Sequence, residues 1–394
     1  MHKLSVIHSF PTWLPLTQTW MYNQVYYLPE EIENHIVCDR TKNLDQFNLP
    51  NIHSLENISK LRLYWEKGLR KLNLQQSSPL LIEIAKKKQS EIVHSHFGHL
   101  ACSDINTAKK ANLKQIVTFY GYDVNCLPNS NPIWIKKYQK LFANVERVLC
   151  EGPHMGRCIV NLGCPPEKVI VHHLGVKINQ IDYQPRTWNR EEPLRILMAA
   201  SFIEKKGFPD GLEALGILQH EIPLEVTIIG DASQSNPKNR KIQSQIEKEK
   251  ILATIDKYKL SKKVRLLGYQ PYSVFFEEAY KHHIFLSPSI TASDGDTEGG
   301  APVSIIEMAA TGMPIVSTTH CDIPEVIKHG ITGLLAPERD VAELVNHLRW
   351  YINHSTQWAK MLDAGRKHIE TEYDAQTQGQ KLAEIYQDVA KSQS

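Results

Sequence analysis

The chain has 394 residues, of which 42% are hydrophobic and 22% are charged, and its formal net charge is +2. This length exceeds the size at which a single hydrophobic core stops growing, so two domains are expected. The small net charge gives no general attraction to nucleic acid, and no apolar run approaches the roughly 20 residues that a membrane-spanning helix needs.

The start of the chain and the cysteines both point to the cytoplasm. Residues 1–8 lead directly into a strand-like pattern, with no apolar signal-peptide core and no small-residue cleavage site. The 7 cysteines are odd in number, scattered, and without C-x-x-C spacing. This predicts reduced thiols that serve packing and argues against a zinc site. We therefore expect a cytoplasmic protein.

Short apolar strand patterns alternate with longer helical patterns, as in parallel α/β layers. In the first half, strands are expected at residues 4–8, 35–38, 92–95, 115–119, 147–150 and 169–172. A polar stretch with two prolines, residues 177–193, then interrupts the alternation. In the second half, strands are expected at residues 195–199, 225–230, 264–267, 284–287, 315–317 and 333–336.

Two α/β domains in tandem follow from this alternation, at residues 1–180 and 181–375. Residues 376–394 are expected to form a C-terminal helix, for which packing back on the first domain is one arrangement. Residues 233–259 are predicted to be an exposed insertion with an amphipathic helix, whose apolar positions are Ile242, Ile246, Ile251, Leu252 and Ile255. Ligands of such sheets bind beyond the carboxyl ends of the strands, so a cleft between the domains is the expected site.

Lysine runs concentrate positive charge in the first half of the chain, at residues 86–88, 109–110 and 136–137. Two interpretations remain open for them. They form either a plain solvated helix face or a contact surface for anionic lipid.

The most informative segment is residues 297–318, TEGGAPVSIIEMAATGMPIVST. Glu298 precedes a glycine pair, and a short buried helix is expected to follow Pro302 and to end near Gly312. Free N–H groups and the positive end of the helix dipole at this junction would attract an anion such as a diphosphate. Glu307, inside the helix, would then lie within reach of a hydroxyl-bearing group.

Further fragments along the chain match the pattern of one enzyme family. They are HSHFG at 94–98, FYGYD at 119–123, EKKG at 204–207, IGD at 229–231, LGY at 267–269, the 297–318 segment, DIPE at 322–325 and GITGLL at 330–335. Together they resemble the family 4 glycosyltransferases, retaining enzymes of the GT-B fold, in which two Rossmann-like doubly wound domains face a central cleft. The resemblance implies transfer of a hexose from a UDP- or GDP-sugar to a glycan or lipid-linked acceptor, with formation of an α-glycosidic bond, in polysaccharide or glycolipid biosynthesis.

On the donor side, the resemblance assigns Lys206 to the charge of the diphosphate leaving group. It assigns Glu307 to the hydroxyls of the nucleotide ribose and Glu298 to the transferred sugar. Gly268 and Tyr269 resemble the segment that reads the base through main-chain contacts. The remaining donor-site positions are Ser201, Gly299, Gly300, Ala301, Pro302 and Val303.

On the acceptor side, His96 resembles the family histidine near the transferred sugar and stands with Lys206 and Glu298 among the catalytic candidates. A packed structural histidine is the alternative. The neighbouring His94 is expected to point to the opposite face of its strand. Tyr120 and Asp123 follow another strand as further acceptor-side candidates.

Three positions depart from the family pattern. Eight residues separate Glu298 from Glu307, where the family has seven, so either Glu298 or the backbone at Gly299 occupies the first carboxylate position. Ser201 stands where an arginine usually precedes the lysine. Tyr120 replaces the usual histidine on the acceptor side.

The sequence predicts neither a metal nor a cofactor beyond the nucleotide-sugar co-substrate. The run 294–296, Asp-Gly-Asp, superficially resembles an Asp-x-Asp metal motif, but hard cations need several converging oxygen ligands. The expected partners are the donor and the acceptor, without nucleic acid, and peripheral contact with the inner face of the cytoplasmic membrane stays an option. Rival functions are a nucleotide-sugar epimerase or a phosphorylase of the same fold, or a non-catalytic sugar-nucleotide-binding subunit.

Overall fold

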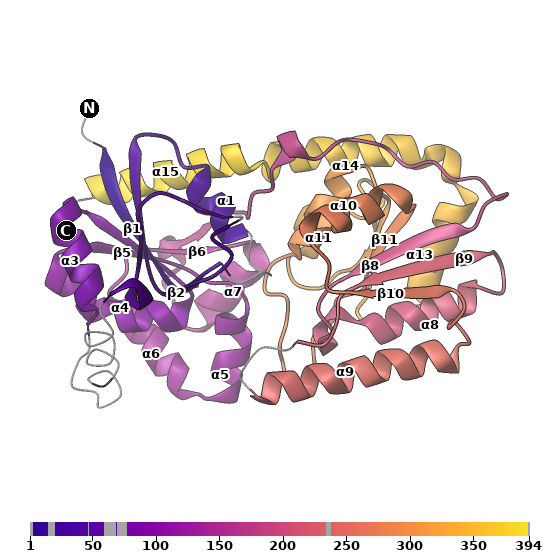
Figure 1. Cartoon of the computed structure of the whole chain (residues 1–394), viewed down its shortest axis with the longest axis horizontal. Helices are drawn as coiled ribbons and strands as arrows, with labels where there is room; N and C mark the ends of the chain where they lie inside the picture. Colours follow the sequence, from indigo (N-terminus) through magenta and orange to yellow (C-terminus); the bar gives the residue numbers. More distant parts are fainter. Residues whose placement is uncertain are drawn as a thin grey trace. The chain divides into compact units, whose positions relative to one another are not determined.

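The structure of the protein is a computed structural model that describes residues 3–14, 20–45, 47–58, 68, 77–233 and 238–392. The chain forms two compact units (Figure 1). The first contains Met1–Lys177 and Tyr373–Ser394, and the second contains Ile178–Glu372. The second unit is therefore an insertion within the sequence of the first. The two crossings lie within three residues of the predicted boundaries at 180 and 375.

The first unit is built on a parallel sheet with seven described strands in the order β3-β2-β1-β4-β5-β6-β7. The strands are β1 Leu4–Trp13, β2 Ile32–Thr41, β3 Ile52–Ser54, β4 Ile92–His96, β5 Lys114–Thr118, β6 Arg147–Cys150 and β7 Val169–Val171. Six of them coincide with predicted strands. The additional strand, β3, has three residues, too few for a sequence pattern to show.

Helices cover both faces of this sheet. They are α1 Trp20–Tyr26, α3 Pro79–Lys88, α4 Gly98–Ala111, α5 Leu127–Ser130, α6 Ile133–Phe142, α7 Pro153–Asn161 and α15 Ala375–Lys391. Successive side chains of a strand point to opposite faces, so Val6 packs in the core cluster that contains Leu382 of α15. Its neighbour Ile7 packs in the cluster that contains Leu81 of α3. The last helix of the chain thus completes the core of the first unit.

The second unit repeats the same design with a parallel sheet whose six described strands run in the order β10-β9-β8-β11-β12-β13. The strands are β8 Leu194–Ala199, β9 Leu224–Ile229, β10 Val264–Gly268, β11 Ile284–Ser287, β12 Ile315–Thr318 and β13 Leu334–Ala336. All six coincide with predicted strands. Two Rossmann-like α/β units therefore confirm the predicted fold class.

The helices of the second unit are α8 Phe208–Leu218, α9 Lys238–Lys257, α10 Tyr272–Lys281, α11 Val303–Ala310, α12 Ile323–Val326, α13 Val341–Asn353 and α14 Trp358–Glu372. In Figure 1, α8 and α9 lie on one side of the sheet, and α10 and α11 lie on the other. Leu212 of α8, Ile251 of α9 and Leu348 of α13 join the strand residues in one core cluster.

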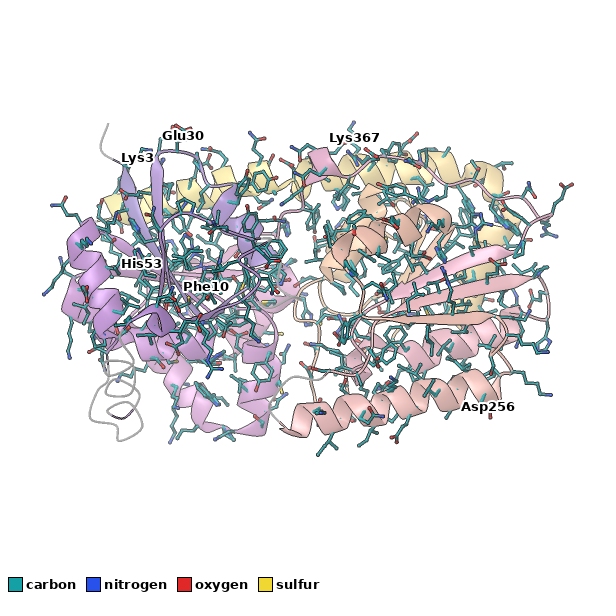
Figure 2. The ribbon with its side chains drawn as sticks, in the orientation of Figure 1. Lys3, Phe10, Glu30, His53, Asp256 and Lys367 are labelled. Atoms are coloured by element: carbon teal, nitrogen blue, oxygen red, sulfur yellow. The ribbon has the colours of Figure 1, made fainter. Side chains whose placement is uncertain are left out.

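The predicted amphipathic helix exists as α9, but only two of its five predicted apolar positions are buried, and Leu252 is 42% exposed. Ile251 and Ile255 are buried, whereas Ile242 and Ile246 are 50% and 48% exposed. In the first half of the helix the inward position is occupied by the polar Ser244, whose hydroxyl donates to the Phe202 carbonyl at 2.7 Å. Figure 2 shows Asp256, near the end of α9, on its outer side. Residues 234–237 of the predicted insertion lie outside the described residues.

Two further observations bear on the cellular setting. All 7 cysteines are free thiols, in line with the sequence prediction. Among the described helices, none combines the length and the apolarity that crossing a bilayer requires.

Candidate functional site

The predicted donor-site residues of the second unit gather where its strands end. Ser201 and Lys206 follow β8, and Glu298 follows β11, which is the neighbour of β8 in the sheet. Gly268 ends β10, and its carbonyl accepts a hydrogen bond from the N–H of Gly230, which follows β9. The carboxyl ends of parallel strands meet at one edge of a sheet, so these segments surround a common point.

The segment before α11 offers free donors, as predicted. Gly299 adopts a left-handed φ of +80°, and its N–H donates to the Thr297 hydroxyl. Within the described chain, the N–H groups of Gly300, Ala301 and Val303 have no recorded acceptor. These N–H groups and the helix dipole attract negative charge to the start of α11.

Lys206 and Glu298 form a buried ion pair beside this helix start. The Lys206 Nζ lies 2.8 Å from Glu298 Oε2, and the side chains are 18% and 6% exposed. The Ser289 hydroxyl donates to the other carboxylate oxygen at 2.8 Å. Burial opposes ionisation of Glu298, but the ammonium groups of Lys206 and Lys205 outweigh it and lower its pKa to about 2.

Gly299, which lies between the two glutamates, has a left-handed φ of +80°. Its left-handed conformation, which glycine adopts without strain, turns the chain so that the Glu298 carboxylate faces Lys206. The Glu298 side chain therefore presents its negative charge beside the lysine. Which of Glu298 and the Gly299 backbone takes the first carboxylate position of the family pattern stays a prediction.

His320 and Glu338 form a hydrogen-bonded relay that holds the Glu298 backbone and that the sequence did not predict. The Glu298 N–H donates to His320 Nε2 at 3.1 Å, and His320 Nδ1 lies 2.7 Å from Glu338 Oε1. Glu338 also accepts the Thr291 N–H at 2.6 Å. Both roles of the imidazole require a proton on Nδ1 and a lone pair on Nε2. The relay joins the segments that follow β11, β12 and β13.

Glu307 lies on α11 with its side chain buried, 6% exposed as a residue. The Tyr272 hydroxyl, from the first turn of α10, donates to Glu307 Oε1 at 2.5 Å. Burial raises the pKa of Glu307 to about 7, although the Tyr272 hydrogen bond acts in the opposite direction. At neutral pH this carboxyl is poised between its two protonation states.

The predicted base-reading segment is open to solvent. Gly268 has a left-handed φ of +69°, and a Cβ built there would meet no atom within 4 Å. Tyr269 is 50% exposed as a residue. Ser201, at the position of the missing arginine, lies two residues beyond the end of β8 and is partly buried. Ser201 carries no charge, so it cannot replace that arginine. Lys206 is the cation that contacts the Glu298 carboxylate, at 2.8 Å.

The Asp-Gly-Asp run is held by protein groups. An Asp296 carboxylate oxygen lies 3.2 Å from the Lys205 Nζ, which also donates to the Thr297 carbonyl at 2.6 Å. The Asp294 carboxylate accepts the Asp296 N–H at 3.0 Å, as in a local turn. The run thus fixes the loop that leads into the Glu298 segment.

In the first unit, His96 lies inside a fully buried histidine cluster with His8 and His94. His8 Nδ1 and His96 Nε2 are 3.2 Å apart, and one ring nitrogen of each of the three lies within 4.8 Å of the others. The prediction that His94 points to the opposite face of its strand was wrong. Residues two apart on a strand share a face, and the rings of His94 and His96 stack with centroids 4.2 Å apart.

Each ring of the cluster has protein partners on both nitrogens. His8 Nε2 lies 3.2 Å from Asn34 Oδ1. His94 lies 2.6 Å from both the Tyr386 and the Thr118 hydroxyls. Burial lowers the pKa of His8 to about 4 and the pKa values of His94 and His96 well below 6.5, so the three rings are neutral at physiological pH.

The acceptor-side candidates lie together, and all face inward. The Tyr120 hydroxyl, where the family has histidine, lies 2.6 Å from His96 Nδ1. Phe10, labelled in Figure 2, stacks on the His96 ring with centroids 3.9 Å apart. The Asp123 carboxylate accepts the N–H groups of Gly98 and Tyr120 at 2.6 and 2.9 Å, and burial raises its pKa to about 6. His96, Tyr120 and Asp123 are 0%, 9% and 0% exposed, an arrangement that suits bracing the β4–α4 turn.

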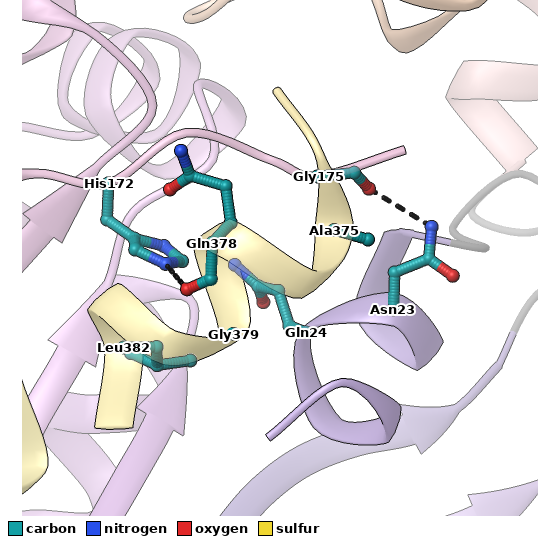
Figure 3. Close-up of a pocket in the computed structure, with 8 residues that line it drawn as sticks. All are labelled: Asn23, Gln24, His172, Gly175, Ala375, Gln378, Gly379 and Leu382. Carbon is teal, nitrogen blue, oxygen red and sulfur yellow. Dashed lines mark hydrogen bonds between the residues drawn. The ribbon is translucent and has the colours of Figure 1, made fainter. Parts of the chain in front are cut away.

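A small pocket lies behind this cluster, between α1 and α15 (Figure 3). Gln24, whose Oε1 accepts the Tyr120 hydroxyl at 3.0 Å, lines it together with His172 and Gly379. It encloses about 10 Å³, whereas pockets for small molecules measure about 300–1,000 Å³. The pocket therefore belongs to the packing of the first unit and is too small for a sugar.

Comparison with known proteins gives a consistent result. Residues 180–368 match the family model described as glycosyl transferases group 1, and residues 17–180 match that of glycosyltransferase family 4. The amylovoran biosynthesis glycosyltransferase AmsK of Erwinia amylovora is 32% identical over 326 residues, which span 80% of this chain and 75% of that protein.

Two solved structures share the fold of the chain. A glycosyltransferase from Rickettsia africae superposes with a TM-score of 0.75 at 18% identity and covers 100% of both chains. Anabaena Alr3699/HepE, in complex with UDP and glucose, superposes with a TM-score of 0.75 at 14% identity and covers 98% of this chain and 100% of its own.

Proposed function

The chain belongs to glycosyltransferase family 4, with the GT-B fold, and on that premise we propose that it transfers a hexose from a nucleoside diphosphate sugar to a glycan or glycolipid acceptor with retention of configuration. The Erwinia relative acts in the biosynthesis of a polysaccharide, which supports a role in cell-surface polysaccharide synthesis. UDP or GDP is the proposed nucleotide, and the UDP in the Anabaena structure supports the first of the two.

One observation carries the proposal: Lys206 pairs with Glu298 beside a helix start whose backbone N–H groups are unused, and a second carboxyl, Glu307, lies on that helix. Lys206 and the N–H groups of Gly300 and Ala301 supply positive charge for a diphosphate. Glu307, on the same helix, is proposed to accept hydrogen bonds from the ribose hydroxyls. The Glu298 oxygens each retain a lone pair after bonding Lys206 and Ser289, and these can accept hydroxyls of the transferred sugar.

The proposed reaction needs no metal. The acceptor oxygen attacks the anomeric carbon from the face that the diphosphate leaves, so the bond to the phosphate oxygen breaks as the bond to the acceptor forms. The departing phosphate oxygen takes the acceptor proton. Lys206 stabilises the charge on the leaving group, and Glu298 favours positive charge that develops on the sugar ring. The product is an α-glycoside when the donor is α-linked.

For the acceptor side we propose that His96 and Tyr120 shape the acceptor pocket from behind, since both are buried. For His96 to contact the sugar directly, one of its ring nitrogens would have to give up its hydrogen bond with His8 or Tyr120. His96→Ala should raise KM for the acceptor while donor affinity stays unchanged. Equal acceptor and donor effects would contradict this division.

Peripheral contact with the inner face of the cytoplasmic membrane is proposed for α6. Ile133 is 51% exposed there, Lys136 and Lys137 are exposed, and the Lys137 Nζ lies 4.1 Å from the centroid of the Trp134 ring. Exposed lysines beside aromatic and apolar side chains suit an anionic lipid surface. Co-sedimentation with phosphatidylglycerol vesicles should fall in a Lys136→Glu, Lys137→Glu variant. Unchanged binding would favour a plain solvated face.

The decisive test is a donor panel of UDP- and GDP-sugars by calorimetry, followed by mass spectrometry and NMR of the products formed with glycan and glycolipid acceptors. Release of UDP or GDP that depends on acceptor, with a retained anomeric configuration, is the expected result. Conversion of the donor to an epimeric nucleotide sugar would indicate an epimerase. Formation of a sugar phosphate from a glycan and inorganic phosphate would indicate a phosphorylase, and binding without turnover a non-catalytic subunit. An inverted product would refute the retaining mechanism.

A further inference from the structure

Tyr272 links two parts of the donor site that the family resemblance treats separately. It is the first residue of α10 and follows directly on the Gly268–Pro271 segment, which is expected to read the base. Its hydroxyl reaches Glu307 on α11 at 2.5 Å, and α10 and α11 lie next to each other in Figure 1. The base segment and the ribose carboxylate are therefore joined by one side chain.

The contact uses one of the two oxygens of the Glu307 carboxyl. Tyr272 is 51% exposed as a residue, although its hydroxyl lies at a buried carboxyl. Its edge packs against the Phe276 ring with centroids 5.0 Å apart, which fixes the ring on α10. The hydroxyl occupies Oε1 of Glu307, and among the described residues no protein donor is recorded for Oε2. A carboxylate oxygen that is held on one side can accept two hydroxyls of a vicinal diol on its free side.

We propose that Tyr272 is a positioning residue for nucleotide binding: it holds Oε1 of Glu307 so that Oε2 faces the 2′,3′-diol of the ribose. This rests on the proposed function, since it assumes a nucleotide donor at this site. It adds a residue that acts through Glu307 and not on the ligand itself.

The protonation of Glu307 supports the same role. A carboxyl that accepts from both Tyr272 and a diol must be ionised, and burial opposes this by raising its pKa to about 7, whereas the Tyr272 hydrogen bond favours the ionised form. Arg366 of α14 and Arg186 face α11, but they donate to the carbonyls of Ala310 and Thr311 at its C-terminal end. Without the Tyr272 hydroxyl, less of the carboxyl is ionised at neutral pH.

The test measures binding of UDP and GDP, each with ribose and with 2′,3′-dideoxyribose, from pH 6 to 9. The terminal phosphate titrates equally in both sugar forms, so the ratio of the two affinities isolates the diol. Tyr272→Phe should weaken binding of the ribose form about fivefold at pH 7, the typical worth of one hydrogen bond, and leave the dideoxy form unchanged. In this variant the preference for ribose should set in at a higher pH than in the wild type, because the Glu307 carboxyl ionises at a higher pH.

Two further variants complete the design. Glu307→Gln should remove the pH dependence of the ribose preference, and Tyr272→Phe should have no additional effect in that background, because the tyrosine acts through the carboxylate. Tyr280→Phe is the matched control, because it removes a hydroxyl from the same helix that donates to the Asp182 carbonyl at 2.9 Å, and it should leave the ribose preference unchanged.

The outcomes separate this proposal from the proposed function. Equal loss of both sugar forms in Tyr272→Phe, or an unchanged ribose preference, would overturn the role of Tyr272 while nucleotide binding itself stood. A wild-type protein that binds UDP or GDP without preferring ribose would overturn it as well, because Glu307 would then read no diol. A wild-type protein that binds neither nucleotide would refute the donor assignment and the role of Tyr272 together.

Discussion

Removal of the positive charge of Lys206 tests structure and function at once. Lys206→Met keeps the aliphatic stem but leaves the Glu298 carboxylate, 6% exposed, without its partner at 2.8 Å. The pKa of Glu298 is lowered from 4.5 to about 2, which corresponds to about 3 kcal/mol because one pKa unit is worth about 1.4 kcal/mol. We expect the second unit of Lys206→Met to be less stable by about 3 kcal/mol at pH 7.

The effect has a defined dependence on pH. A carboxyl whose pKa is lower in the folded state stabilises the protein above its unfolded pKa, here 4.5, and this contribution is lost as the pH falls toward 2. The stability difference between the wild type and Lys206→Met should therefore be full at pH 7. It should shrink by about 1 kcal/mol between pH 4.5 and 3.5.

Hydrogen exchange as a function of urea, read on peptides that span β11 and β12, reports the stability of the second unit separately from the first. Lys206→Met with Glu298→Gln should regain most of the lost stability but no transferase activity, which separates the structural from the catalytic role of the lysine. Lys205→Met is the matched control, because its partner Asp296 is more exposed, at 17%, and a smaller loss is expected. A Lys206→Met protein as stable as the wild type at pH 7, or a double variant as unstable as the single one, would refute the reasoning.

Three further outcomes follow from the site. His320→Gln keeps a hydrogen-bond acceptor near the Glu298 N–H, whereas His320→Asn keeps only a donor near Glu338. Because the first contact positions Glu298, kcat should be higher in the glutamine variant than in the asparagine variant. Equal kcat values would argue against the relay. The pKa of Glu307 is raised from 4.5 to about 7, so the folded protein holds a proton that the unfolded chain releases, and stability should fall by about 3 kcal/mol as the pH rises from 4.5 to 7. Glu307→Gln should flatten that part of the urea-unfolding pH profile, and an unchanged profile would contradict the burial argument. Transfer should proceed at the same rate after EDTA treatment, whereas activity lost to EDTA and restored by Mg²⁺ would contradict the metal-free reaction.

The strands were predictable because buried parallel strands read as continuous apolar runs. Predicted and observed bounds coincide for β11 at 284–287, whereas β1 runs to Trp13, five residues beyond its predicted end. The face of α9 was less predictable. Ile242 and Ile246 fit the helical period, yet the residue that packs inward beside them is Ser244, because a carbonyl at Phe202 needed a donor. Hydrophobic periodicity carries no information about which buried backbone carbonyl takes a side-chain donor.

Sequence reasoning named the candidate site residues one by one but not the contacts between them. Lys206 and Glu298 were both identified, whereas their ion pair depends on β8 and β11 being neighbours in the sheet. Tyr272 and His320 belong to no motif, and their roles arise from partners that are 35 and 22 residues away in the chain. His8 lies opposite His94 in the pairing of β1 with β4, so an assumed strand order could have revealed the cluster.

The insertion of the second unit within the first has a consequence for how the protein is made. Residues 373–394 leave the ribosome only after the whole of the second unit, yet Tyr386 bonds His94 and Leu382 belongs to the core of the first sheet. The first unit thus begins to be synthesised before the second but is completed after it. Until α15 has been synthesised, the face of the first sheet that it covers stays exposed. Premature termination near residue 372 would leave the second unit entire and the first with an uncovered apolar face, open to aggregation or chaperone capture.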